Sequence, residues 1–205
     1  MIGVIDYKAG NGPSVLNALN NLNIEASLVS TSEQIEGLSA IILPGVGSAE
    51  ATVSSLKEMN CLNAIEHMVL NRGLPFMGIC IGLQVLFEHS EEGDVDCLGW
   101  IHGSVKKFSE RAVRVPQIGW NEACFTQSHP ILNGLNKSEY FYFVNSYYVE
   151  PNDKSIILAE TEYGGKFCSM ISYKNIIASQ FHIEKSGVVG LKILKNFGLI
   201  AGGNL

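Results

Sequence analysis

Residues 75–84 read PFMGICIGLQ, and this stretch decides both the expected fold and the expected chemistry. A short apolar run after a proline predicts a buried strand, and glycines two residues before and after Cys80 permit a sharp turn into a helix. Glycines allow strained backbone and close approach of neighbouring chain, while a helix N-terminus favours thiolate and offers N–H groups to an oxyanion. The pattern predicts a nucleophile elbow at Cys80. A cysteine buried in an apolar strand remains the alternative.

The chain before this stretch alternates apolar runs with amphipathic patterns, which is typical of a parallel sheet connected by helices. Strands are expected at residues 1–6, 25–29, 40–43 and 76–79. Helices are expected near residues 14–22, with Ser14 as N-cap, and near residues 53–59 and 62–72. The third strand is stopped by residues 43–48, which read LPGVGS and predict a tight turn.

The second half of the chain changes character, because its apolar runs are β-branched and aromatic. Extended segments are expected at residues 103–108, 140–148, 156–161, 167–173 and 176–181. They predict added antiparallel strands, followed by a helix near residues 187–197. With 205 residues, 46% of them hydrophobic, and neither repeat nor linker, residues 1–205 are expected to form a single α/β domain.

Composition excludes several function classes. A net charge of -6 argues against binding to nucleic acid or to an anionic membrane, because no basic surplus is present. Met1 is followed by IGVI with no basic leader, and no apolar run approaches spanning length, so we expect a cytoplasmic protein. The five cysteines are scattered and odd in number, so they are expected to be free thiols, four of them small buried side chains. Neither metal nor cofactor is expected, because no ligand spacing is present around His67, His89, His102 or His129.

A second chemical pattern lies at residues 178–186, which read ASQFHIEKS. Strand alternation can point His182 and Glu184 the same way, so that His182 takes the proton of Cys80 while Glu184 orients the imidazole. Taken alone, His182 could be a solvated residue at a strand end, and Glu184 could form a surface ion pair with Lys185. In combination with the elbow, the three side chains predict a Cys–His–Glu triad.

These motifs together resemble a known family. The elbow, the LPGVG turn at residues 43–47 and QFHIEKS at residues 180–186 resemble class I glutamine amidotransferases. Residues 5–11 (IDYKAGN), 119–121 (GWN) and 142–148 (YFVNSYY) are similar to the glutaminase subunit of bacterial imidazole glycerol phosphate synthase. The resemblance implies a flavodoxin-like doubly wound, mostly parallel sheet. It also implies glutamine hydrolysis through a thioester on Cys80.

The same resemblance implies further site residues. The backbone N–H of Ile81 is one expected oxyanion donor, and the second is expected from the turn at Val46 and Gly47. That turn's sequence would equally suit a plain strand-to-helix connection. Four side chains are expected to help hold glutamine: Gln84, Ser146, Tyr147 and, one helical turn beyond Gln84, Glu88.

A partner is implied as well. In the family, ammonia passes to a (β/α)8-barrel cyclase subunit, which makes imidazole glycerol phosphate and an aminoimidazole carboxamide ribotide for histidine biosynthesis. The resemblance places Asn11, Tyr142 and Lys185 at the contact surface of this heterodimer. Each has a simpler interpretation, as a turn asparagine, a half-exposed strand tyrosine and a solvated lysine.

Three places depart from the commoner pattern of the histidine-pathway subunit: Lys8-Ala9, Gly12-Pro13 and Ile183, which stands where proline is usual. Loss of that proline is expected to relax the turn without removing a catalytic side chain. Because the first two changes fall in the partner-facing loop, other functions stay open. The chain could supply ammonia to a sugar amidotransferase in surface-polysaccharide synthesis, act as a silent scaffold subunit, or use the elbow as a protease or esterase.

Overall fold

The computed structural model describes residues 1–7 and 11–203. Lys8 and Ala9, two of the positions that depart from the family pattern, lie outside the described residues.

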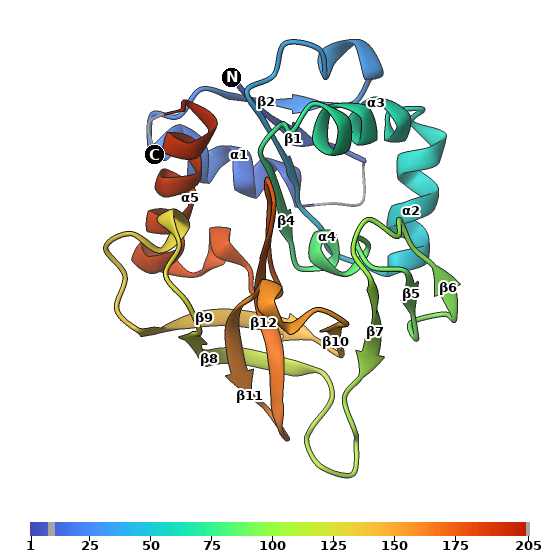
Figure 1. Ribbon diagram of the computed structural model, residues 1–205, viewed down its shortest axis with the longest axis vertical. Coiled ribbons are helices and arrows are strands. Elements are labelled where there is room, and N and C mark those ends of the chain that lie inside the picture. Colours follow the sequence, from blue (N-terminus) through green and yellow to red (C-terminus); the bar gives the residue numbers. More distant parts are fainter. Residues whose placement is uncertain (8–10, 204–205) are drawn as a thin grey trace.

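A parallel sheet forms the centre of the molecule (Figure 1). Its strands are, in spatial order, β2 (Ala26–Val29), β1 (Ile2–Ile5), β3 (Ala40–Leu43), β4 (Phe76–Ile79) and β13 (Ile176–Ser179). All neighbours in this row are parallel, and every residue of the four strands β1, β3, β4 and β13 is buried. Such strands need cover on both faces, as their continuous apolar runs predict.

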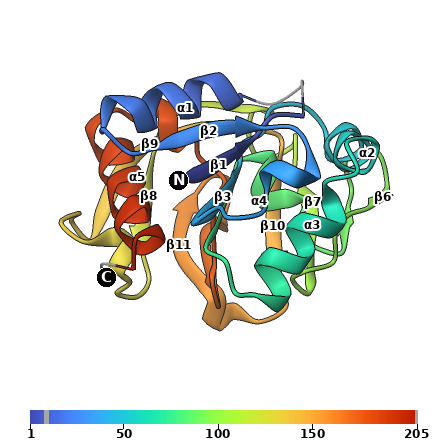
Figure 2. The ribbon, with the colours of Figure 1, turned by 90° about the horizontal axis from the view of Figure 1, so that it is seen from above.

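Helices provide that cover. Figure 2 places α1 (Gly12–Asn21) and α5 (Gly187–Ala201) on one side of the sheet, and α2 (Ala49–Glu58) and α3 (Leu62–Glu66) on the other. A π-helical turn at His67–Asn71 extends α3. The expectation that Ser14 caps the first helix is wrong, because α1 begins at Gly12. Pro13 therefore lies in the first turn, where a missing N–H leaves no helical hydrogen bond unmade.

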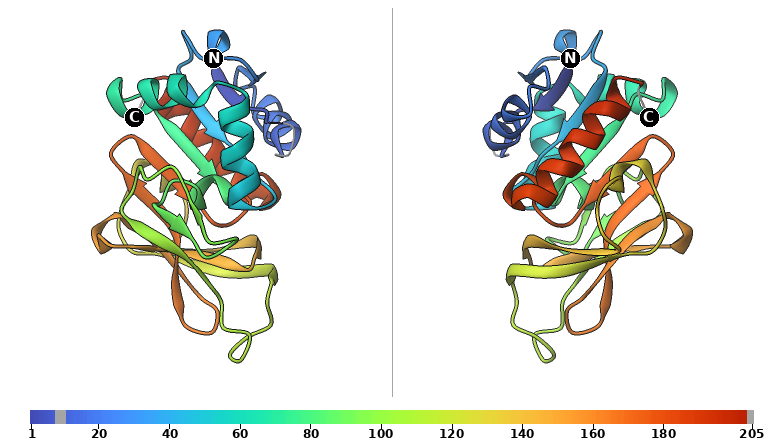
Figure 3. Two further views of the ribbon diagram at one scale, coloured as in Figure 1. Left: turned by 90° about the vertical axis from the view of Figure 1, so that its right-hand side faces the viewer. Right: turned by 90° about the vertical axis from the view of Figure 1, so that its left-hand side faces the viewer.

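The second half adds a mostly antiparallel extension to this sheet, drawn below the helices in Figure 3. Beyond β13 the row continues with β12 (Lys166–Tyr173), β10 (Tyr147–Pro151), β7 (Gly103–Lys107), β5 (His89–Ser90) and β6 (Val95–Asp96). A branch leaves it at β12 through β11 (Ile157–Glu162), β8 (Gln117–Phe125) and β9 (Ser138–Asn145). The single extended segment expected at residues 140–148 is divided at Ser146 into β9 and β10.

Short 3-10 turns complete the described elements, at Ser32–Gln34, Pro130–Leu132, Lys154–Ile156 and Ile183–Lys185. No helix in the described ranges is long and apolar enough to cross a membrane. All five cysteines are free thiols, as expected. Cys124 is exposed and Cys97 is only partly buried, so the expectation of four buried structural cysteines is wrong for these two.

Two apolar cores flank the central sheet. One joins the sheet to α2 and α3 and includes Phe76 and Leu56; the other joins it to α1 and α5 and includes Phe181 and Phe197. In the second core the rings of Phe141 and Phe181 stack with centroids 3.9 Å apart. This stack ties β9 of the antiparallel branch to the chain that follows β13, and so fixes the branch against the end of the parallel sheet.

Candidate active site

The carboxyl ends of parallel strands meet at one edge of a sheet, and ligand sites of doubly wound folds lie there. At this edge β1 is followed by Tyr7, β3 by the turn of residues 44–47, β4 by Cys80 and β13 by the segment that carries His182. Four segments that are far apart in the sequence therefore converge, and they carry the residues expected from the sequence motifs.

Cys80 occupies a strained turn between β4 and α4 (Ile81–Gln84). Its backbone has φ 56° and ψ -108°, which a residue with a side chain rarely adopts. A Cβ on Gly78 would lie 2.4 Å from the carbonyl oxygen of Gly82, and one on Gly82 would lie 2.1 Å from that of Leu43. Both glycines are thus required by close backbone packing, which agrees with the nucleophile elbow expected from the sequence.

The helix after the elbow is shorter than expected. Because α4 spans only Ile81–Gln84, its macrodipole is small, and its main contribution to an oxyanion is individual backbone N–H groups. Cys80 is buried, with 8% of the residue exposed. Its Sγ lies 3.6 Å from Nε2 of Gln180 and 3.9 Å from the carbonyl oxygen of Val144, so it faces the end of β9.

His182 and Glu184 form a buried pair beside this thiol. Nδ1 of His182 lies 2.9 Å from Oε1 of Glu184, and both side chains are at most 3% exposed. Strand alternation does not bring them together as expected, because β13 ends at Ser179. The 3-10 turn Ile183–Lys185, with His182 as its N-cap, turns the carboxylate back to the imidazole instead.

The imidazolium of His182 and the carboxylate of Glu184 stabilise one another. Burial opposes a charged imidazole, but contacts with the Cys80 thiol and the Glu184 carboxylate outweigh burial and raise the pKa of His182 to about 9. Burial also opposes the carboxylate, yet the hydrogen bond and charge of His182 hold the pKa of Glu184 below its usual range. The site therefore favours a protonated His182, which is paired with the Glu184 carboxylate and lies beside the Cys80 side chain.

Ile183, where proline is usual, is the first residue of this 3-10 turn and packs into the second apolar core. A proline would suit that first position, since its N–H is not needed there. The turn nevertheless forms with isoleucine, and both triad side chains keep their contact.

Asn11 lies in the site rather than only at the expected partner surface. Its Nδ2 donates to Oε1 of Glu184 at 2.6 Å. Although Asn11 is the N-cap residue of α1, its side chain makes no capping hydrogen bond. The sequence carries no signal for this contact, because it joins residues 173 positions apart.

Gln84 is buried, and the side chain of Gln180 links it to the Cys80 thiol. Its Nε2 donates to Oε1 of Gln180 at 3.0 Å and to the carbonyl oxygen of Tyr147 at 3.2 Å, while Nε2 of Gln180 contacts Cys80. Two further residues are expected at the substrate. Ser146 forms the break between β9 and β10, Tyr147 is the first residue of β10, and both are half-buried. Gln180 was missed by the sequence analysis, in which it counted only as part of a motif.

Two further amides at the end of the β8–β9 pair were missed. Gln117 and Asn145 face each other across these strands. Both side-chain polar atoms of Gln117, and Oδ1 of Asn145, are buried without a hydrogen-bond partner in the described parts of the chain. Nδ2 of Asn145 donates to the carbonyl oxygen of Tyr147 at 3.0 Å. The unpaired amide of Gln117 and the unpaired Oδ1 of Asn145, the residue after the Val144 carbonyl that contacts Cys80, are suited to a polar ligand.

The expectation for Glu88 rests on a wrong premise. Because α4 ends at Gln84, Glu88 does not continue its face. The Glu88 carboxylate is engaged elsewhere, with Oε1 2.9 Å from Nδ1 of His102 and Oε2 accepting from the backbone N–H of Gly103 at 2.9 Å. The hydrogen bonds from Gly103 and His102 hold the pKa of Glu88 below its usual range, and the residue is exposed at the surface.

The turn of residues 44–47 packs directly on the residue after the nucleophile. A Cβ on Gly45 would lie 1.8 Å from Cγ2 of Ile81, so only glycine fits between them. Gly47 has φ +107°, and Val46 is partly exposed. The structure thus brings Val46, Gly47 and Ile81, the three expected backbone donors, to the same edge as Cys80.

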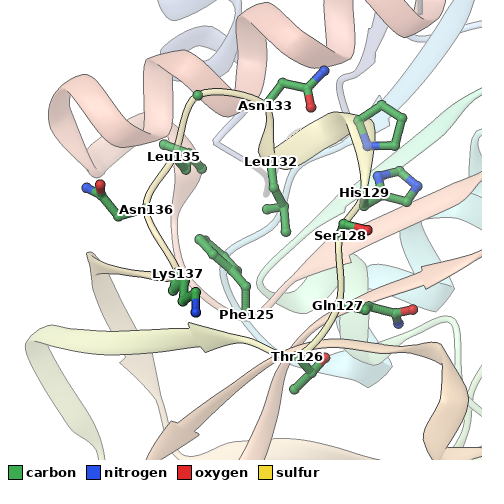
Figure 4. Close-up of a pocket in the computed structure, with 12 residues that line it drawn as sticks. Phe125, Thr126, Gln127, Ser128, His129, Leu132, Asn133, Leu135, Asn136 and Lys137 are labelled. Carbon is green, nitrogen blue, oxygen red and sulfur yellow. The ribbon is translucent and has the colours of Figure 1, made fainter.

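A separate hollow lies elsewhere and carries none of this chemistry. A pocket of about 770 Å³ is lined by the connection from β8 to β9, residues 125–137 (Figure 4). Its side chains include Phe125, Leu132 and His129, whose Nδ1 accepts from the backbone N–H of Ile131. Among the described residues, no group of three His, Cys, Asp or Glu side chains could hold a metal ion.

Comparison with known proteins identifies the family. Residues 3–201 match the family Glutamine amidotransferase class-I. The chain is 45% identical over 205 residues to imidazole glycerol phosphate synthase subunit HisH of Dehalococcoides mccartyi, covering all of this chain and 99% of that protein. It is 41% identical over 198 residues to the subunit HisH of Methanocaldococcus jannaschii, covering 96% of this chain and 98% of that protein.

Solved structures confirm the fold. A glutamine amidotransferase crystal structure superposes with a TM-score of 0.76 at 22% identity, covering 98% of each chain. The structure of PurLQS from Thermotoga maritima superposes with a TM-score of 0.73 at 18% identity, covering 96% of each chain. The expected doubly wound α/β fold is therefore confirmed, with a larger antiparallel extension than the sequence indicated. This chain belongs to the class I glutamine amidotransferase family and, within it, to the HisH subunits of imidazole glycerol phosphate synthase.

Proposed function

We propose that this HisH family member releases ammonia from glutamine through a thioester on Cys80, with His182 and Glu184 completing the triad. The observation that carries the proposal is the buried 2.9 Å contact of His182 with Glu184 beside a thiol on a strained elbow. A silent scaffold would have no need to keep a strained cysteine and a buried ion pair together, because both features cost stability and are retained where they serve catalysis.

The charges at the site define the order of proton transfers. The Cys80 thiolate attacks the amide carbon of glutamine, and the carbonyl oxygen becomes an oxyanion. As this intermediate collapses, His182 gives its proton to the departing nitrogen, ammonia leaves and a thioester remains on Cys80. Water, deprotonated by His182, then attacks the thioester and releases glutamate with the thiol restored. Glu184 stabilises the imidazolium in both steps.

The oxyanions of both steps need donors. The N–H of Ile81 follows the nucleophile directly, and the turn at Val46 and Gly47 packs on Ile81. We assign the second donor to this turn, because its contact with Ile81 places its peptides at the same edge as the thiol.

Glutamine is held, in this proposal, by the amide-lined wall beside the thiol. Gln84 and Ser146–Tyr147 border it. The unpaired Nε2 of Gln117 offers a donor to the carboxylate of the substrate, and the unpaired Oε1 of Gln117 and Oδ1 of Asn145 offer acceptors to its amino group.

Trapping the thioester tests this mechanism. Wild-type protein mixed with glutamine and quenched in acid is expected to carry a glutamyl adduct, which peptide mapping places on Cys80. Cys80→Ala should carry none, and Cys124→Ala, which removes an exposed thiol elsewhere, should match wild type. An adduct that persists in Cys80→Ala would contradict the assignment of the nucleophile.

We propose that the cyclase subunit of imidazole glycerol phosphate synthase docks on the outward face of β8 and β9. Cross-strand partners put Ile118 opposite Val144 and Trp120 opposite Tyr142, so these four side chains share one face. Ile118 is 65% exposed and Trp120 is 56% exposed. Aromatic and aliphatic side chains concentrated on one exposed face are typical of a protein interface.

This face is joined to the triad by hydrogen bonds. The carbonyl oxygen of Tyr142 accepts from the backbone N–H of His182 at 2.9 Å, and the N–H of Tyr142 donates to Oγ of Ser186 at 3.0 Å. Oγ of Ser186 in turn donates to the carbonyl oxygen of His182 at 2.6 Å. Lys185 lies between these residues in the sequence and is exposed. A partner that binds Tyr142 and Lys185 would therefore shift the position of the His182 backbone.

The partner is tested by adding candidate barrel subunits to the purified chain. The relatives named above favour the histidine-pathway cyclase over a sugar amidotransferase, so glutamate release should rise with the cyclase. Trp120→Ala should weaken the complex by about 2 kcal/mol or more, as for a central interface aromatic. Leu70→Ala, which truncates an exposed apolar side chain on another surface, should not. Stimulation only by a sugar amidotransferase would support the polysaccharide alternative instead.

A further inference from the structure

Gln180 is a buried residue that the proposed thioester mechanism does not use, although its side chain contacts the reacting sulfur. It directly follows β13, and the parallel register of that strand with β4 pairs Ser179 with Ile79. The backbone N–H of Cys80 donates to the carbonyl oxygen of Ser179 at 2.7 Å. The backbone N–H of Gln180 donates to the carbonyl oxygen of Ser169 at 2.8 Å. These backbone contacts fix Gln180 beside Cys80, away from solvent.

The orientation of the Gln180 amide follows from its hydrogen-bond partners. The carbonyl oxygen of Tyr147 can only accept, so the atom of Gln84 that lies 3.2 Å from it must be the nitrogen Nε2. The same Nε2 donates to the Gln180 side chain at 3.0 Å, so Gln180 must present its oxygen to Gln84. The amide nitrogen of Gln180 is thereby directed at Sγ of Cys80, 3.6 Å away.

Two polar contacts of this sulfur suit different protonation states. The carbonyl oxygen of Val144, at 3.9 Å, is an acceptor and is therefore suited to the protonated thiol. The amide of Gln180 is a donor, and a donor stabilises a charged acceptor more strongly than a neutral one. Because Cys80 is buried, water has little access to replace this donor. The Gln180 amide therefore favours the thiolate over the thiol.

We propose that Gln180 is a further catalytic residue whose amide N–H stabilises the Cys80 thiolate, and that Gln84 is a positioning residue that holds this amide in one orientation. The inference rests on the proposed thioester mechanism, because a thiolate matters only where Cys80 is the nucleophile. It adds to that mechanism a donor outside the triad and outside the oxyanion turn. It also gives Gln84 a role that does not depend on contact with glutamine.

Alkylation of Cys80 by iodoacetamide, followed against pH in the full chain, measures the thiolate without any substrate. Peptide mapping separates Cys80 from the exposed thiol of Cys124. Gln180→Met has an unbranched side chain of similar length without an N–H. Its pH of half-maximal alkylation should rise by about one to two units, as expected for loss of a hydrogen bond to a charged group. With the cyclase subunit bound, kcat/KM for glutamine should fall about tenfold to a hundredfold.

Gln84→Met tests the positioning role without adding a charge. It removes the donor that holds the oxygen of Gln180, so the Gln180 amide is free to direct either end at the sulfur. Alkylation of Cys80 should shift in the same direction as in Gln180→Met, but by less. In the double variant the change at Gln84 should add no further shift, because the two residues act through one contact. A full additional shift would contradict the positioning role.

Two further variants separate this role from a loss of stability. Gln127→Met is the matched control, because Nε2 of Gln127 donates to the carbonyl oxygens of Ser155 and Ile157 at 3.0 and 2.9 Å, in the connection from β8 to β9. It should leave the alkylation profile of Cys80 unchanged. Gln180→Glu keeps the shape of the side chain and an oxygen for Gln84, but directs an oxygen at the sulfur. It should raise the pH of half-maximal alkylation at least as far as Gln180→Met.

Wild-type alkylation profiles in both Gln180 variants would overturn the inference. A lower kcat/KM with an unchanged profile would overturn it as well, because the amide would then act on something other than the thiolate. Cys80→Ala distinguishes this failure from failure of the mechanism. Glutamate release that persists in Cys80→Ala would contradict the thioester mechanism itself. Complete loss there, together with wild-type profiles in the Gln180 variants, would contradict only the role given to Gln180.

Discussion

Asn11 and His182 share one oxygen of Glu184. Oε1 accepts from Nδ2 of Asn11 at 2.6 Å and from Nδ1 of His182 at 2.9 Å. Asn11, the N-cap residue of α1, is thereby tied to the C-terminal segment that carries His182 and Glu184. The family resemblance implies that Asn11 also lies at the partner surface, so we propose that this hydrogen bond links partner docking to the Glu184 carboxylate.

Asn11→Ala tests the role of that hydrogen bond. A hydrogen bond to a charged group contributes about 1.5–3 kcal/mol, so its loss should lower kcat of the complex about tenfold while the fold is retained. Asn20→Ala, on an exposed position of α1, is the matched control and should have wild-type kcat. Wild-type kcat in Asn11→Ala would show that Glu184 does not depend on this donor.

The pH profile tests the charge state of His182. Its pKa is raised to about 9, so the imidazolium is present below that pH and is lost above it. The kcat/KM for glutamine should therefore fall as the pH rises through about 9. Glu184→Gln removes a negative charge from the imidazole, lowers its pKa and should move this alkaline limb to lower pH. If the alkaline limb of kcat/KM stays at the same pH in Glu184→Gln, a group other than His182 controls it.

Cys80 should be a site where function opposes stability. Its backbone, at φ 56° and ψ -108°, suits glycine, and such strain costs about 1–3 kcal/mol. Cys80→Gly should therefore be at least as stable as Cys80→Ala, although glycine usually lowers stability by about 0.5–1 kcal/mol. Urea denaturation of the two inactive variants compares their free energies of unfolding. If Cys80→Gly were markedly less stable than Cys80→Ala, the inferred backbone strain at Cys80 would be contradicted.

Gly45→Ala tests whether the turn needs its contact with Ile81. The added methyl would overlap Cγ2 of Ile81 and push the turn from the elbow. Loss of one oxyanion donor lowers kcat about 10²–10³-fold, so an effect of this size is expected in the complex, with little change in KM. Gly198→Ala on α5 meets only the end of the Ile24 side chain and should keep its activity. Equal activity of Gly45→Ala and Gly198→Ala would show that the turn is not part of the oxyanion site.

The elbow and the parallel strands were predictable because their causes are local. An apolar run such as Phe76–Ile79 must be covered on both faces, and glycines beside Cys80 permit few backbone paths. The pairing of His182 with Glu184 was also predictable, although the 3-10 turn that produces it was not. That turn depends on tertiary contacts of Ile183 and Ser186, which local propensity does not report.

Other parts of the site depend on pairing between distant segments. Gln117–Phe125 contains polar residues and a glycine at φ +138°, and it becomes a strand only through its pairing with β9. The amides of Asn11, Gln117 and Gln180 give no sequence signal, because an amide that meets a partner and one that meets water look alike in sequence. Glu88 was misplaced for a related reason, since the sequence does not show where a short helix such as α4 ends.

The central claim is that Cys80 is the nucleophile of a glutaminase. Steady-state glutamate release from glutamine, measured with the cyclase subunit bound, tests it most directly. Wild type and Cys124→Ala should release glutamate at the same rate, and Cys80→Ala, which binds the cyclase equally well, should release none above background. Glutamate release by Cys80→Ala at the wild-type rate would contradict the account.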